Sequence, residues 1–115
     1  MFTVPSLREA LLRAKNRGVD IKIILEKNPY NAVTINNETV QFLKKNHFAF
    51  YETNDQYFSF MHAKYMIIDD TWIIATANWT RSSFSSNREF FIIGNDALIL
   101  ADLISIFETD FSGEK

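Results

Sequence analysis

The two side chains in this 115-residue chain best suited to chemistry on an anion are the imidazole of His62 and the ammonium of Lys64. Their segment continues as the apolar run Met66–Ile68 and then reaches turn residues, which predicts a strand leading into a hairpin. Because side chains alternate along a strand, His62 and Lys64 are expected on one face. An imidazole beside an ammonium is costly to bury. The pair therefore predicts a site for a cluster of anionic oxygens.

A second strand is expected to run back from the hairpin and to end at Asn78. If Asp69–Thr71 forms a three-residue loop, Lys64 faces Thr76 and His62 faces Asn78, so that all four side chains converge. A two-residue turn would shift the pairing by one and send Asn78 to the other face.

The spacing H-x-K-x4-D, formed by His62, Lys64 and Asp69 and followed by Asn78, resembles the active-site motif of the phospholipase D superfamily. The resemblance covers roughly residues 6–111. It implies a phosphodiesterase whose histidine attacks phosphorus and forms a phosphohistidine intermediate. In the resembling enzymes the aspartate is not the nucleophile and supports the site.

The resemblance also implies a role for Glu89, which opens an otherwise apolar strand. A carboxylate on one ring nitrogen of the histidine fixes the tautomer and leaves the other nitrogen free to attack. The alternative is a glutamate at the sheet edge, paired with Arg88 or a lysine. The expected catalytic residues are His62, Lys64, Asn78, Glu89 and Asp69.

The expected substrate-binding residues are Thr76, Trp79 and Ser82. Ala75-Thr76 departs from the usual Gly-Ser, although threonine keeps a hydroxyl, and Thr76 is equally well explained as a strand former. Trp79 either lines a substrate groove beside Asn78 or packs in the core or rim. The chain has no cysteine and no histidine or aspartate cluster with ligand spacing, so neither a metal site nor a cofactor is predicted. The only other histidine, His47, is expected to be structural or exposed.

The chain carries one motif, whereas the resembling enzymes need two, one histidine as nucleophile and the other as general acid. The resemblance therefore implies a homodimer or a second motif-bearing domain, with residues 78–87 at a two-fold interface and Trp79 and Phe84 as apolar anchors. The substrate stays open between nucleic acid and phospholipid. A different class also stays open, namely a non-catalytic dimerising or nucleic-acid-binding domain that keeps the fold.

Alternating helices and strands must position these residues, and the pattern predicts one α/β domain over residues 1–115, with a mixed β-sheet flanked by helices. Ser6 and Asp96 are the expected N-caps of the first and last helices. The expected helices cover residues 6–17, 38–46 and a segment after 96, and the expected strands cover 19–26, 48–51, 58–68, 72–78 and 89–93. The resembling domains begin with strands before the first helix. Either those N-terminal strands are lacking because this is a piece of a longer chain, or a minimal version has its sheet edge covered by a partner.

Composition limits the remaining classes. The chain is 47% hydrophobic with a net charge of -2, so any binding of a polyanion must depend on a local patch. No apolar run approaches the ~20 residues that span a bilayer, and the N-terminus lacks the layout of a signal peptide. A soluble, cytoplasmic protein is the expectation.

Overall fold

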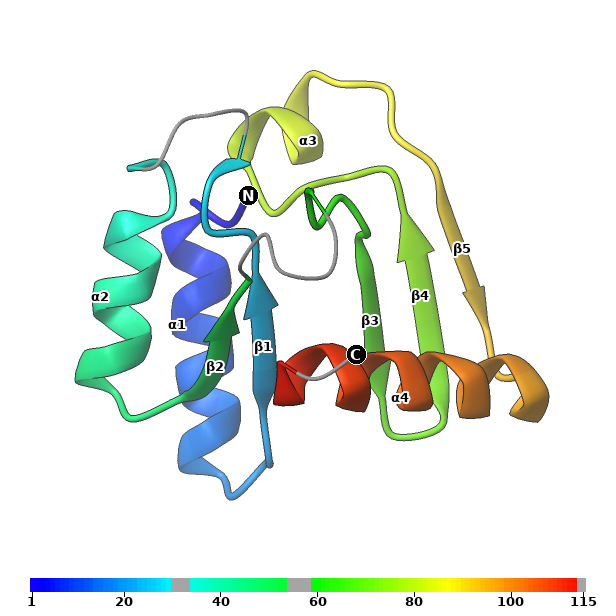
Figure 1. Ribbon diagram of the computed structural model, residues 1–115. Helices are drawn as coiled ribbons and strands as arrows, with labels where there is room; N and C mark the ends of the chain where they lie inside the picture. Colours follow the sequence, from blue (N-terminus) through cyan, green and yellow to red (C-terminus); the bar gives the residue numbers. More distant parts are fainter. Residues whose placement is uncertain (30–33, 54–58, 114–115) are drawn as a thin grey trace.

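The computed structural model describes residues 1–29, 34–53 and 59–113, and Figure 1 shows how their elements are arranged. Outside these ranges lies Phe58, the predicted start of the strand that carries His62 and Lys64. Parts of the predicted connections at 27–36 and 52–57 lie outside them as well. The elements in chain order are α1 (Pro5–Asn16), β1 (Lys22–Leu25), α2 (Asn37–Lys45), β2 (Ala49–Glu52), β3 (Tyr65–Ile68), β4 (Thr71–Ala75), α3 (Arg81–Ser85), β5 (Phe91–Gly94) and α4 (Ala97–Ser112).

The predicted α/β class with flanking helices is confirmed, but within the described ranges the strands form two sheets rather than one mixed sheet. β1 and β2 pair in parallel, and β3, β4 and β5 pair antiparallel in that order. Helix α4 packs against β1, β2 and β3 and so crosses from one sheet to the other (Figure 1). Among these residues β1 pairs only with β2, and β3 pairs only with β4, so no strand pairing joins the two sheets.

The core lies with the parallel sheet, where α1 and α2 cover one side (Figure 1). Its buried side chains come from the N-terminus, β1, α2 and the approach to β2: Phe2, Leu25, Val40, Leu43 and Phe48. The predicted N-cap at Ser6 is wrong, because α1 begins at Pro5 with Val4 in the cap position. Proline suits a first helical residue, since its φ is already helical and that position needs no N–H. The predicted cap at Asp96 is confirmed by hydrogen bonds from the backbone N–H groups of Leu98 and Ile99.

Of the two registers that the sequence leaves open for the hairpin, the three-residue loop is wrong and the two-residue turn is the one that forms. Ile68 pairs with Thr71, so the loop has two residues, and Asp69 takes a φ of 53°. Aspartate tolerates this left-handed conformation better than most residues, which allows the chain to reverse without a third loop residue. The backbone of Lys64 therefore lies opposite Ala75, whose N–H donates to the Lys64 carbonyl at 2.9 Å.

Both strands of this hairpin are also shorter than predicted. β3 begins at Tyr65 and β4 ends at Ala75, so His62, Lys64 and Asn78 lie just outside regular strand. Their positions depend on side-chain contacts as well as on the sheet. Among the described residues, no helix is both long enough and apolar enough to cross a membrane.

Candidate active site

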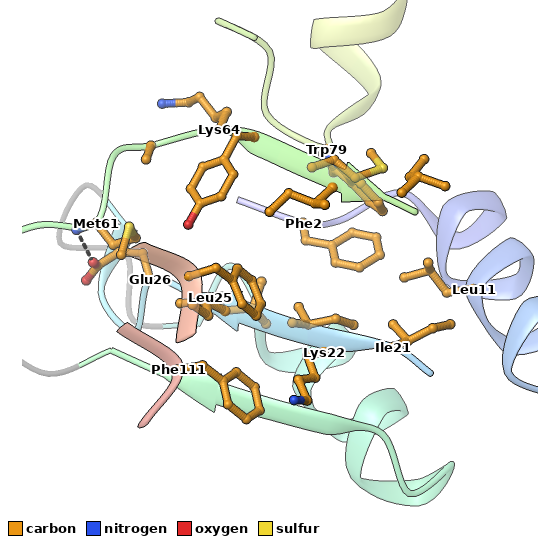
Figure 2. Close-up of a pocket in the computed structure, with 18 of the residues that line it drawn as sticks. Phe2, Leu11, Ile21, Lys22, Leu25, Glu26, Met61, Lys64, Trp79 and Phe111 are labelled. Atoms are coloured by element: carbon orange, nitrogen blue, oxygen red, sulfur yellow. Dashed lines mark hydrogen bonds between the residues drawn. The ribbon is translucent and has the colours of Figure 1, made fainter. Parts of the chain in front are cut away.

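A cleft of about 760 Å³ lies between β1 and β3 and is lined along its length by residues 19–26 and 60–69. Figure 2 shows its interior, with apolar side chains such as Leu25 and Phe111 and with Glu26 joined to the backbone of Met61. His62, Lys64, Asp69 and Asn78 also line this cleft. The structure therefore brings four of the five predicted catalytic residues to one cavity.

His62 and Lys64 lie in the segment that leads into β3. The Lys64 ammonium donates to the backbone carbonyl of His62 at 2.7 Å, and the exposed His62 ring lies 5.7 Å from the Phe60 ring between centroids. Partial burial lowers the pKa of Lys64, while the negative charge of Glu89 acts in the opposite direction. Lys64 is thus a cation placed beside His62 and within the electrostatic reach of Glu89.

Glu89 is hydrogen-bonded within its own part of the fold. Ala75 pairs with Phe91, and beyond this pair the Thr76 N–H donates to the Phe90 carbonyl at 3.1 Å. The Thr76 hydroxyl donates to the Glu89 carboxylate, and the Asn87 amide donates to its other oxygen at 3.3 Å. The Thr76 bond is the main reason that the pKa of Glu89 is lowered, although some burial opposes the shift.

These bonds also describe Thr76. Its oxygen accepts the Phe90 N–H at 3.0 Å, while its hydrogen is directed at Glu89. Thr76 therefore holds Glu89 in the structure, and a contact with substrate stays a prediction. The orientation of His62 by Glu89 stays a prediction as well.

Asn78 and Trp79 follow β4 and meet the N-terminus. The side-chain oxygen of Asn78 accepts from the Met1 ammonium at 3.1 Å. Trp79 makes a parallel bridge with Phe2, and the two rings meet edge to face at 4.8 Å. Of the two interpretations of Trp79, the structure supports packing against the core, although this residue also borders the cleft.

The remaining two predicted residues lie in different surroundings. Ser82 is exposed in the first turn of α3, where its hydroxyl lies 3.3 Å from that of the N-cap Thr80. Asp69 is exposed in the hairpin turn, at the opposite end of β3 from Lys64. The geometry thus separates Asp69 from the group formed by Lys64, Thr76 and Glu89.

Sequence reasoning missed two buried polar residues, Glu26 and Asn36. Glu26 follows β1, and its carboxylate accepts three hydrogen bonds, one of them from the N–H of Met61. Asn36 donates to the Glu26 carbonyl at 3.1 Å and accepts from the Phe2 N–H at 2.9 Å. A carboxylate at the end of the apolar β1 segment was a usable signal for Glu26, whereas Asn36 lies in an asparagine-rich stretch without a distinctive pattern.

Metal ligands do not gather in the part of the chain that the structure describes. No group of three or more histidine, aspartate or glutamate side chains is placed there to hold an ion, and the sequence has no cysteine.

Comparison with solved structures identifies the fold as phospholipase D-like. Nuc of Salmonella typhimurium, a phospholipase D family member, superposes with a TM-score of 0.85 and 22% identity, over 99% of this chain and 74% of that one. NucT from Helicobacter pylori superposes with a TM-score of 0.80 and 21% identity, over 97% of this chain and 74% of that one.

The sequence identifies the family more closely. Residues 1–111 match the family described as cardiolipin synthase, PLD-like domain, and the chain belongs to this family. It is 32% identical over 108 residues to the mitochondrial cardiolipin hydrolase of Xenopus laevis, covering 93% of this chain and 49% of that protein. The Mus musculus protein of the same name is 27% identical over 108 residues, covering 93% and 47%. The chain thus spans about half the length of these curated relatives.

Proposed function

We propose that this domain contributes one half-site of a phospholipase D-like phosphodiesterase. The observation that carries the proposal is the adjacency of His62 and Lys64 at the cleft, with the Glu89 carboxylate acting on Lys64 electrostatically. An ammonium beside a nucleophile supplies the positive charge that a reacting phosphodiester needs. Membership of the cardiolipin synthase PLD-like family supports the same activity.

In the proposed reaction a ring nitrogen of His62 attacks phosphorus. The P–N bond forms while the P–O bond to the leaving group breaks, and the departing oxygen takes a proton from a second acid. Lys64 stabilises the non-bridging oxygens, with Asn78 as a further donor. Water, or an alcohol, then gives a proton to the second group, which now acts as a base, and attacks phosphorus, so that the P–N bond breaks and the imidazole is released. Glu89 is assigned the orientation of His62, and Thr76 holds Glu89 in place.

One His62 cannot serve as nucleophile and as leaving-group acid in the same step, because the two groups stand on opposite sides of phosphorus. A second copy, or another domain with the motif, must supply the acid, and a two-fold arrangement is the economical solution. Phe84 is 55% exposed and remains the proposed apolar anchor of such an interface. Trp79 is less suited to that role because it packs against Phe2.

Hydrolysis of bis(p-nitrophenyl) phosphate in EDTA tests the proposal. His62→Ala should abolish turnover while circular dichroism stays that of the folded chain. His47→Asn is the matched control, because His47 is exposed and its φ of 58° suits asparagine. Unchanged turnover in His62→Ala would end the catalytic assignment. Cardiolipin vesicles and single-stranded DNA, offered in parallel, then separate the two substrate classes.

A non-catalytic domain is the second candidate, and Thr76 is the observation that favours it. Ala75-Thr76 replaces the usual Gly-Ser, and the hydroxyl that would meet phosphate is engaged by Glu89. Under this alternative the purified chain shows no turnover of any phosphodiester, and His62→Ala binds polyanions as well as the unmodified chain does.

A further inference from the structure

Glu26 is a buried carboxylate at the junction of the two sheets. The residue is 8% exposed and follows directly after β1. One oxygen accepts the Asn28 N–H at 3.0 Å, and the other accepts the Thr53 hydroxyl at 3.0 Å and the Met61 N–H at 2.6 Å. A carboxylate is costly to bury, and three donors offset much of that cost.

The bond to Met61 matters for the site because Met61 precedes His62. This segment lies ahead of β3, so in the described residues no strand partner fixes it. The Glu26 carboxylate ties its backbone to the end of the parallel sheet (Figure 2). Without that acceptor, a half-buried N–H loses its partner and the residue before the imidazole loses its anchor.

A second route leads from Glu26 to the other half of the site. Its backbone carbonyl accepts from Asn36, which accepts in turn from the Phe2 N–H. Phe2 bridges Trp79, and the N–H of Trp79 donates to the Met1 carbonyl at 3.0 Å. The segments that carry His62 and Asn78 are thus both fixed relative to Glu26.

We propose that Glu26 is a positioning residue for His62, acting through the hydrogen bond from the Met61 N–H to its carboxylate. The kinetic part of this inference rests on the proposed phosphodiesterase activity, whereas the structural part does not. A misplacement of about 1 Å in a reacting group can cost on the order of 10² in rate. Charge alone makes the opposite demand, because a carboxylate near a phosphate site weakens the binding of the substrate anion.

Three variants of Glu26 distinguish positioning through the Met61 hydrogen bond from the effect of the negative charge. Glu26→Gln removes the charge but keeps an amide oxygen for the Met61 N–H, whereas Glu26→Asp keeps the charge and withdraws the acceptor by one methylene. Glu26→Ala removes both. Positioning predicts a kcat loss of about 10²-fold for Glu26→Ala, with KM changed less than about threefold, and a kcat for Glu26→Gln within about tenfold of the unmodified chain. The control is Thr53→Val, which removes another Glu26 bond and should stay within about threefold.

Imidazole NMR provides a readout that does not depend on activity. The chain has 2 histidines, so His47 is an internal reference for His62. We expect the Cε1–H signal of His62 to move in Glu26→Ala and Glu26→Asp and to stay near its original position in Glu26→Gln. The His47 signal should stay unchanged in all three variants.

An unmoved His62 signal in Glu26→Asp would overturn the proposal. So would the reverse result, in which Glu26→Asp keeps the kcat and His62 signal of the unmodified chain and Glu26→Gln does not. Parallel shifts of His47 would also overturn it, because they would indicate a general change of fold. If Glu26→Ala fails to fold, the comparison of Gln with Asp decides alone. If the unmodified chain is inactive, the proposed activity fails, while the NMR comparison still decides whether Glu26 positions His62.

Discussion

Gly94 is the residue whose replacement should most clearly expose the packing that joins β4 to β5. It pairs with Trp72 across the two strands. An added Cβ would lie 2.3, 2.6 and 2.9 Å from the indole carbons Cζ2, Cη2 and Cε2. Carbon atoms in contact are normally about 3.5–4.0 Å apart, so the ring would have to move by roughly 1 Å. The absence of a side chain at position 94 is therefore what allows the Trp72 ring to lie so close to β5.

Trp72 has little room to move, since it is 6% exposed and its Nε1–H donates to the Asp96 carbonyl at 3.3 Å. Overpacking of this kind costs about 1–3 kcal/mol, and loss of the hydrogen bond adds about 1 kcal/mol. Alanine has less conformational freedom than glycine in the unfolded chain, which stabilises the folded state by about 0.4–1 kcal/mol and offsets part of this loss. Gly94→Ala should thus lower the free energy of unfolding by about 1–3.5 kcal/mol and the Tm by roughly 4–14 °C.

Urea titration followed by circular dichroism measures this loss, and a double-mutant cycle identifies its cause. In a Trp72→Leu background the clashing atoms are gone, so Gly94→Ala should cost less than about 0.5 kcal/mol. An equal cost in both backgrounds would refute the close approach of Trp72 as the reason. A Gly94→Ala chain as stable as the original would refute the packing itself.

Three further predictions concern the site. Thr76→Val removes the main cause of the lowered pKa of Glu89, so a carbon-detected carboxyl titration should show that pKa rising toward its ordinary value, and an unchanged titration contradicts the bond. Ionised Glu89 contributes stability that is present above its unfolded pKa, and in the variant this stability is lost at a higher pH on acidification. Glu89→Gln removes the charge that raises the pKa of Lys64, so the alkaline limb of the rate profile should move to lower pH, and a shift to higher pH would rule out this coupling. A one-to-three mixture of unmodified and His62→Ala chains should keep roughly one sixteenth of the undiluted activity if two half-sites are needed, and about a quarter if each chain acts alone. Activity assays at constant total chain concentration distinguish the two outcomes.

Local patterns in the sequence predicted the α/β class, the order of the main elements and the cap at Asp96, because each depends on neighbouring residues. The hairpin was placed correctly, but the sequence left its register open between a two-residue and a three-residue loop. Whether the loop has two or three residues depends on the left-handed conformation of Asp69. An aspartate can adopt this conformation, but its presence in the sequence does not require it. The division into two sheets depends on pairing between distant segments, which periodicity does not report.

The candidate site shows the same limit. Spacing placed His62 and Lys64 together, and the structure brings both to the cleft with Asn78. The contact between Thr76 and Glu89 follows from the pairing of β4 with β5, which the sequence did not fix. Glu26 was missed because its partners, Thr53 and Met61, are 27 and 35 residues away. Side chains that join distant backbone segments leave no periodic pattern to find.

The location of the buried core suggests how stability and site geometry are divided in this domain. The largest buried cluster, with Leu43 at 0% exposure, belongs to the N-terminus, β1, α2 and the approach to β2, whereas the motif hairpin lies in the other sheet. Within the described ranges, the links between the hairpin and that core include α4, the contacts of the N-terminal segment with Asn78 and Trp79, and the Glu26 hydrogen bond to Met61. A unit held by few contacts opens at a lower free energy than the whole domain. Amide exchange should accordingly be faster in β3 than in β1, and changes at Glu26 should disturb the site before they unfold the core.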